Sequence, residues 1–132
     1  MRWIRTFEGK QTEKFNAWFE GSKVVNTDGS PRIVYHGTGE NFVKFSMKKS
    51  VDGTTWFTTN KKEVENKETG AGSHGFIKEL YISLKNPAGW DEYDKYSLGE
   101  LNNMGYDGAI LPLDDINYEG FVFHTNQIRI AK

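Results

Sequence analysis

The stretch that decides the fold reads Ile33-Val34-Tyr35-His36-Gly37-Thr38. A dense turn cluster at residues 26–31 precedes its apolar and β-branched residues, so we expect a strand that begins at Arg32 and ends at Gly37. Glycine lets a ligand approach the backbone closely, and binding residues collect where strands end. The sequence therefore predicts a candidate site at the sheet margin, formed by His36, Gly37 and Thr38.

Working outward, hydrophobic periodicity predicts the other elements. Phe15, Trp18 and Phe19 have the spacing of one helix face, in a helix beginning near Thr12. Ser97 resembles the start of a second short helix, which Gly105 would close. We further expect an irregular segment at residues 40–53, a short helix at 60–68, a loop at 70–75 and strands at 54–59, 76–84, 107–113, 120–124 and 127–130. Without regular βαβ alternation, this pattern predicts an α+β fold with a compact mixed or antiparallel sheet, an N-terminal helix and short peripheral helices.

Composition bounds the class of protein. The 132 residues are enough for one domain spanning residues 1–132. The 17 basic and 18 acidic residues form no long block, so we expect no direct nucleic-acid binding. Cysteine is absent, the three histidines are scattered, and no apolar run has the length of a membrane helix. We therefore expect a soluble cytoplasmic protein without a metal site.

One phosphate-binding pattern has the wrong context. Residues 70–75 read GAGSHG and match the glycine spacing of dinucleotide-binding loops. That loop needs a strand before it and a helix after it, so that the pyrophosphate rests on the helix N-terminus. Here a charged stretch comes before the loop and an alternating strand follows it, so we expect a flexible connection.

Five segments in order carry a resemblance to a known family. They comprise residues 33–38, 56–59 (WFTT), 80–87 (LYISLKNP), 105–108 (GYDG) and 119–128. Together they resemble the diphtheria-toxin-like and poly(ADP-ribose)-polymerase-like ADP-ribosyltransferases, and are similar to phage-encoded members such as type I-F anti-CRISPR ADP-ribosyltransferases. The resemblance covers the chain from about Phe15 onward and implies an ADP-ribosyltransferase-like fold with NAD⁺ as donor and no metal.

The resemblance also implies roles for single residues. In that family the histidine bonds a ribose hydroxyl and the next glycine pairs its backbone with the nicotinamide amide, which assigns these tasks to His36 and Gly37. Tyr35 and Thr38 would support them. Cleavage at the ribose passes through an oxocarbenium-like transition state, which needs an aromatic face for nicotinamide and a carboxylate near the ribose.

The aromatic position is open. Trp56, Phe57 and Thr58 lie in the second family-like segment, but strand core explains either aromatic equally well. Related enzymes place a tyrosine in the helix that follows, whereas residues 61–67 contain no aromatic side chain. Trp56, Phe57 or a distant tyrosine such as Tyr81 is left to stack on the nicotinamide.

The carboxylate is open as well. Glu119 has the family spacing to Phe123, while Asp115 stands in the preceding turn, where flexible backbone could direct it at the donor. An Asx-type turn explains Asp114 and Asp115 equally well. Both Asp115 and Glu119 are candidate acids beside the catalytic His36.

Three whole-protein hypotheses follow. The first is a mono-ADP-ribosyltransferase that modifies a host protein, with the type I-F CRISPR-Cas surveillance complex as the acceptor that the resemblance implies. A doubly negative adduct there would block binding of target DNA. The second is a non-enzymatic module that inhibits its partner sterically, which the missing tyrosine favours. The third is an NAD⁺-dependent RNA 2′-phosphotransferase, for which the sequence offers no basic motif.

Overall fold

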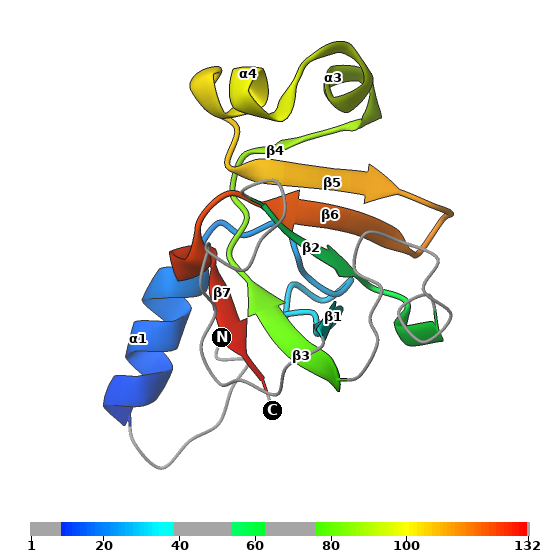
Figure 1. The fold of residues 1–132 in the computed structure, drawn as a ribbon. Coiled ribbons are helices and arrows are strands. Elements are labelled where there is room, and N and C mark those ends of the chain that lie inside the picture. Colours follow the sequence, from blue (N-terminus) through cyan, green and yellow to red (C-terminus); the bar gives the residue numbers. More distant parts are fainter. Residues whose placement is uncertain (1–8, 39–53, 63–75, 132) are drawn as a thin grey trace.

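The fold comes from a computed structural model that describes residues 9–38, 54–62 and 76–131 (Figure 1). The segments expected at residues 40–53 and 70–75 lie outside this part of the chain, as does most of the helix expected at 60–68, of which residues 61–62 are helical. Besides residues 61–62, four helical segments accompany the sheet in the described residues: α1 (Gly9–Phe19), α3 (Trp90–Lys95), α4 (Leu98–Asn103) and the 3₁₀ turn η2 (Thr125–Gln127).

The described strands form one mixed sheet in the order β4-β5-β6-β2-β1-β3-β7. Their bounds are β1 (Val34–Thr38), β2 (Thr55–Thr58), β3 (Phe76–Ile82), β4 (Pro87–Ala88), β5 (Gly108–Pro112), β6 (Tyr118–Val122) and β7 (Ile128–Ile130). The pair β4·β5 is parallel, and the other five pairs are antiparallel. The α+β class and the six expected strands are confirmed, with shifts of at most two residues at their ends, whereas the two-residue β4 was not predicted.

Local chemistry explains where the helices end. Ser97 accepts a hydrogen bond from the Glu100 amide at 3.2 Å, and the Glu100 carboxylate accepts one from the Ser97 amide at 2.9 Å. Gly105, with φ of +97°, follows the last turn of α4. The predicted capping box and terminating glycine are therefore confirmed. Helix α3 was not predicted, although the Glu92 carboxylate, which accepts from the Gly89 amide at 2.7 Å, is a similar signal.

Each face of the sheet has its own buried cluster. One face carries Val34, Phe57, Leu80 and Val122, which join a core completed by Val24 from the segment after α1. The other face carries a second buried cluster, into which α3 and α4 pack side chains. Figure 1 shows α3 and α4 beside the β4–β5 edge and α1 beside β7. The central strands β2 and β1 thus lie between two helical flanks.

The ladder between β1 and β2 is short. It contains one register pair, Tyr35 with Thr58, whereas β1 pairs with β3 at five positions and β2 with β6 at four. The ladder contains no register pair between Gly37 and the first residues of β2. The sheet therefore opens between its two central strands, next to the predicted site.

Candidate functional site

His36 lies at this opening. Its Nδ1 is 2.6 Å from the carbonyl oxygen of Trp56, so the ring donates across the gap to a backbone group that the short β1·β2 ladder does not pair. Burial lowers the pKa of His36, and the bond to Trp56 offsets part of that effect. The imidazole is consequently neutral near pH 7, with the proton on Nδ1 and Nε2 as its acceptor nitrogen.

Gly37, Trp56 and Glu119 share one face of the sheet. Direct partners in a ladder lie on the same face and successive residues alternate, and Thr58 pairs with both Tyr35 and Glu119. Tyr35, Thr58 and Glu119 therefore form one row across β1, β2 and β6, with Gly37 and Trp56 two positions along on the same face. The topology brings together on this face one aromatic and one carboxylate that the sequence analysis named. By the same alternation His36 starts from the opposite face, and its ring reaches into the gap between β1 and β2.

The Trp56 ring sits at the α3 side of this face. It is half-buried, with its centroid 4.8 Å from that of Phe121 and 6.0 Å from that of Tyr93 in an edge arrangement. These contacts fix the ring on two sides. Trp56 is thus an anchored aromatic surface next to the opening where His36 lies.

The other two aromatic candidates point elsewhere. Phe57 is fully buried in the core on the other face of the sheet, where its ring packs edge-on against that of Tyr118, with the two ring centroids 6.4 Å apart. Tyr81 lies under α1, with its ring 5.1 Å from that of Phe15. A ligand could not reach the Phe57 ring without displacing core packing, and the half-buried Tyr81 ring is engaged by Phe15 of α1, so the structure favours Trp56 among the three.

The remaining donor-site candidates are Tyr35, Gly37, Thr38 and Thr58, which lie in or at the ends of β1 and β2. Thr58 is fully buried, and its hydroxyl accepts from the Asn60 amide at 3.2 Å, which closes the turn after β2. Tyr35 is half-buried, Gly37 is buried, and Thr38 pairs with Phe76 at the end of β1.

The two candidate acids lie in different environments. Glu119 is half-buried within β6, one row from His36 and two strands away, which places the two Cα atoms roughly 10 Å apart. Asp115 is exposed in the turn between β5 and β6, before the ladder begins. A ribose could meet both His36 and Glu119 only within the gap between β1 and β2, because the two residues start on opposite faces. Asp115 lies before the start of β6, farther along the ladder from His36, so the register favours Glu119 as the nearer acid.

A network that the sequence analysis missed fixes the start of β6. The Thr59 hydroxyl accepts from the Tyr118 amide at 2.9 Å and lies 3.0 Å from Oδ1 of Asn117. Asp114 in turn accepts from the Asn117 amide at 2.7 Å. Asp114 therefore acts as the turn residue that its type suggested, and Thr59 carries no sequence signal because its partners are far along the chain.

Two classes of feature are absent from the described part of the chain. It holds no group of three or more acidic or histidine side chains arranged to bind a metal ion. None of its helices has the length and apolar character needed to cross a membrane.

Two features indicate the class of protein: an α+β fold, and a sheet that opens beside a strand ending in His-Gly-Thr. The family described as "ADP-Ribosyltransferase in polyvalent proteins" matches residues 26–100, more than half of the chain, and this chain belongs to that family. ADP-ribosyltransferases use NAD⁺ as donor, so the family agrees with the donor that the sequence implied. No curated protein and no solved structure matches the chain significantly.

Proposed function

We propose that this domain is a mono-ADP-ribosyltransferase that transfers one ADP-ribose from NAD⁺ to a side chain of a host protein. The membership in an ADP-ribosyltransferase family supports the reaction class. The observation that carries the proposal is the His36 bond to the Trp56 carbonyl, because it orients the ring in the strand opening and sets the tautomer in which Nε2 is the acceptor nitrogen.

The donor would lie on the face that Gly37, Trp56 and Glu119 share. Nicotinamide would stack on Trp56 and pair its amide with the Gly37 backbone, and His36 would accept from the nicotinamide ribose. When the bond between C1′ and the nicotinamide nitrogen breaks, nicotinamide leaves with the bonding electrons and the ribose becomes cationic. A carboxylate beside that cation stabilises the transition state by electrostatics.

We assign that carboxylate to Glu119 rather than Asp115. The family spacing, the half-buried position within β6 and the shared face with Trp56 all support Glu119. The acceptor nucleophile then attacks C1′ and loses its proton, which completes one transfer. Nothing in the described residues suggests a surface for a growing polymer, so we propose a single addition per acceptor site.

The sequence resemblance names the acceptor to test first. We propose the type I-F CRISPR-Cas surveillance complex, in which an adduct carrying two negative charges on the DNA-binding surface would repel the DNA backbone. The chain's own balanced charge, 17 basic against 18 acidic residues, fits recognition of a protein better than of a polyanion.

The decisive experiment incubates the full chain with NAD⁺ and that complex and reads intact masses. We expect a subunit to gain the mass of one ADP-ribose. A complex of unchanged mass, alongside an active control transferase, rejects this acceptor, and unchanged masses across a panel of host proteins reject protein modification.

Variants of His36 separate its structural role from its proposed chemistry. In His36→Asn, the side-chain amide can still donate to the Trp56 carbonyl, but nothing replaces Nε2. We expect this variant to fold like wild type and to lose transfer by at least about a hundredfold. Wild-type transfer by His36→Asn would contradict the role of Nε2.

A second pair of variants tests the acid. Glu119→Gln should reduce transfer about 10²- to 10³-fold, as removal of one electrostatic contact to a transition state does. Asp115→Asn, the matched change in the exposed turn, should stay near wild type. The reverse ranking would move the acid to Asp115.

The steric alternative predicts a different outcome. A module that inhibits by binding alone would block its partner equally well in wild type, His36→Asn and Glu119→Gln, without any gain in mass. Loss of inhibition together with loss of transfer supports the enzyme.

A further inference from the structure

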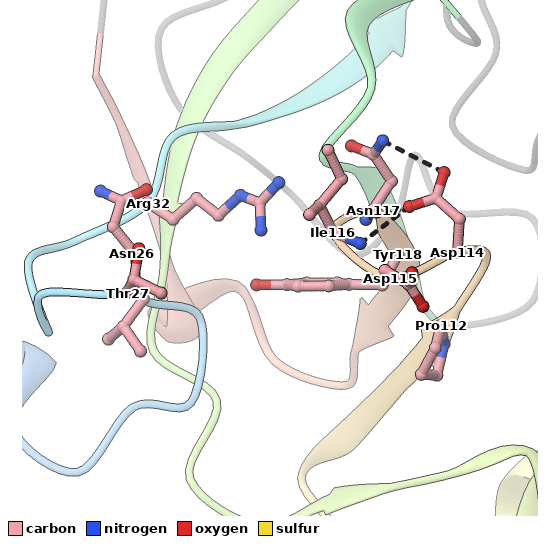
Figure 2. Close-up of a pocket in the computed structure, with 10 residues that line it drawn as sticks. Asn26, Thr27, Arg32, Pro112, Asp114, Asp115, Ile116, Asn117 and Tyr118 are labelled. Atoms are coloured by element: carbon pink, nitrogen blue, oxygen red, sulfur yellow. Dashed lines mark hydrogen bonds between the residues drawn. The ribbon is translucent and has the colours of Figure 1, made fainter.

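A pocket of about 520 Å³ lies between the segment at residues 25–32 and the turn that joins β5 to β6 (Figure 2). Its volume falls in the range of small-molecule sites. Tyr118 and Arg32 form part of its lining, together with Thr27, Asp114 and Asp115. Tyr118 has the opposite sheet-face parity to Glu119, and none of the proposed donor-site residues lines the pocket, so this pocket is separate from the proposed donor site.

The Arg32 guanidinium is held without an ion pair among the described residues. Its central carbon is 5.1 Å from the centroid of the Tyr118 ring, over which it stacks. Asp114, a carboxylate that also lines the pocket, is occupied by the turn: its oxygens accept from the amides of Ile116 at 2.9 Å and Asn117 at 2.7 Å, and from the Asn117 side chain at 3.3 Å. The donor groups of Arg32 therefore have unused capacity.

The Tyr118 hydroxyl is also unsatisfied. It is buried beneath the Arg32 guanidinium, which interacts with its oxygen, and its own proton has no acceptor within the part of the chain that the structure describes. Contact with Phe57 fixes the ring, and Figure 2 shows the hydroxyl end pointing beneath Arg32 toward the side of the pocket that Thr27 lines. A buried hydroxyl without an acceptor is unfavourable, and a ligand oxygen at this point would satisfy it.

We propose that this pocket is a second binding site, for a small organic anion whose carboxylate or phosphate oxygens accept from the Arg32 guanidinium and the Tyr118 hydroxyl. A guanidinium matches either acid group with two parallel hydrogen bonds. The exposed carboxylate of Asp115 on the opposite wall disfavours a second negative charge. The ligand therefore carries its acid at one end and a neutral body at the other.

The test uses two probes that share one body. Benzoate and phenyl phosphate are titrated into the full chain without NAD⁺ and followed by amide NMR shifts, with benzyl alcohol as the neutral counterpart at equal ionic strength. We expect saturable shifts at residues 27, 117 and 118 with at least one acid probe and none with the alcohol. Binding of one acid alone identifies a carboxylate or a phosphate site, and both outcomes support the proposal.

Variants locate the binding groups. Arg32→Gln should weaken the acid probe at least about tenfold, the effect of removing a charged hydrogen-bond partner. Tyr118→Phe removes only the hydroxyl and should weaken it about threefold to tenfold. Arg129→Gln is the matched control, because Arg129 also stacks on an aromatic ring, with its guanidinium carbon 4.7 Å from the Trp18 ring centroid, but lies outside the pocket.

Several results would overturn the proposal. They are the absence of saturable shifts with both acids, equal binding of benzyl alcohol, and equal weakening by Arg129→Gln and Arg32→Gln. His36→Asn should bind the probe like wild type, and loss of binding there would mean that the anion occupies the donor face instead. If Arg32→Gln fails to fold, Tyr118→Phe decides. None of these readouts depends on transfer activity, so the proposed function can fail while the second site stands.

Discussion

Gly120 is a position where the sheet tolerates no side chain. A Cβ at this residue would collide with the carbonyl oxygen of Ala109 and lie 2.7 Å from Cζ of Phe57. Ala109 belongs to the paired strand β5, and Phe57 is fully buried, so neither neighbour can move without breaking the ladder or the core. Replacing Gly120 by alanine must therefore displace β6 itself.

The expected cost follows from that collision. Overpacking in a well-packed core costs about 1–3 kcal/mol, and a backbone collision lies at the upper end. For a domain of this size, Gly120→Ala should lower the urea midpoint on the order of 1 M. Tryptophan fluorescence follows the unfolding, because Trp56 packs on the same central strands.

The control is Gly99→Ala in α4. Nothing lies within 4 Å of a Cβ at Gly99, so alanine should leave stability unchanged or raise it by up to about 1 kcal/mol. A double variant, Gly120→Ala with Phe57→Leu, removes the ring atom from the collision but not the Ala109 carbonyl. We expect partial rescue. A wild-type midpoint for Gly120→Ala would refute the packing argument, and full rescue by the leucine would show that the backbone contact is not limiting.

Three further changes test the site and its supports. His36→Ala leaves the Trp56 carbonyl unpaired and should destabilise the fold by about 1–3 kcal/mol, a loss that His36→Asn should largely avoid in the same urea titration. The pKa of His36 in the folded protein lies below its ordinary value of 6.5, so its contribution to stability is present above pH 6.5 and falls as the pH drops toward the folded pKa. As the pH is lowered, the unfolding midpoint of wild type should therefore fall more steeply than that of His36→Asn. Parallel curves for the two proteins would argue against a buried neutral ring. Ser97→Ala removes the cap of α4 and should cost about 0.5–2 kcal/mol in thermal unfolding. Thr59→Val preserves the side-chain shape but leaves the Tyr118 amide without its acceptor. We expect a stability loss of about 1–3 kcal/mol together with reduced transfer. Unchanged stability would mean that the network is dispensable.

Local structure could be predicted from the sequence wherever residues close in sequence hydrogen-bond to one another. The turn at residues 26–31 forms because Asp28 accepts from the Ser30 amide at 2.9 Å and Gly29 adopts φ of +86°. The helix at Ser97 forms through its own capping box. Both are confirmed as predicted, since their partners lie within four residues and residue type alone reports them.

The candidate site was readable only in part. The strand ending in His36 and Gly37 was predicted from turn chemistry and β-branched residues, and the family resemblance agrees with the family match over residues 26–100. Which aromatic and which acid accompany them could not follow from spacing. Trp56 and Phe57 are adjacent and equally strand-like, so only the sheet register separates them.

The sequence by itself determined most local elements, though not α3 or β4, together with the α+β class and the His36-Gly37 strand end, because short-range hydrogen bonds and hydrophobic periodicity depend on residues close in sequence. The tertiary structure decided the rest. The strand order set β2 between β1 and β6, which put Trp56 and Glu119 on one face and Phe57 in the core. It also set Arg32 over Tyr118. The pairing of strands distant in sequence is fixed by burial of the whole sheet, which no single segment encodes.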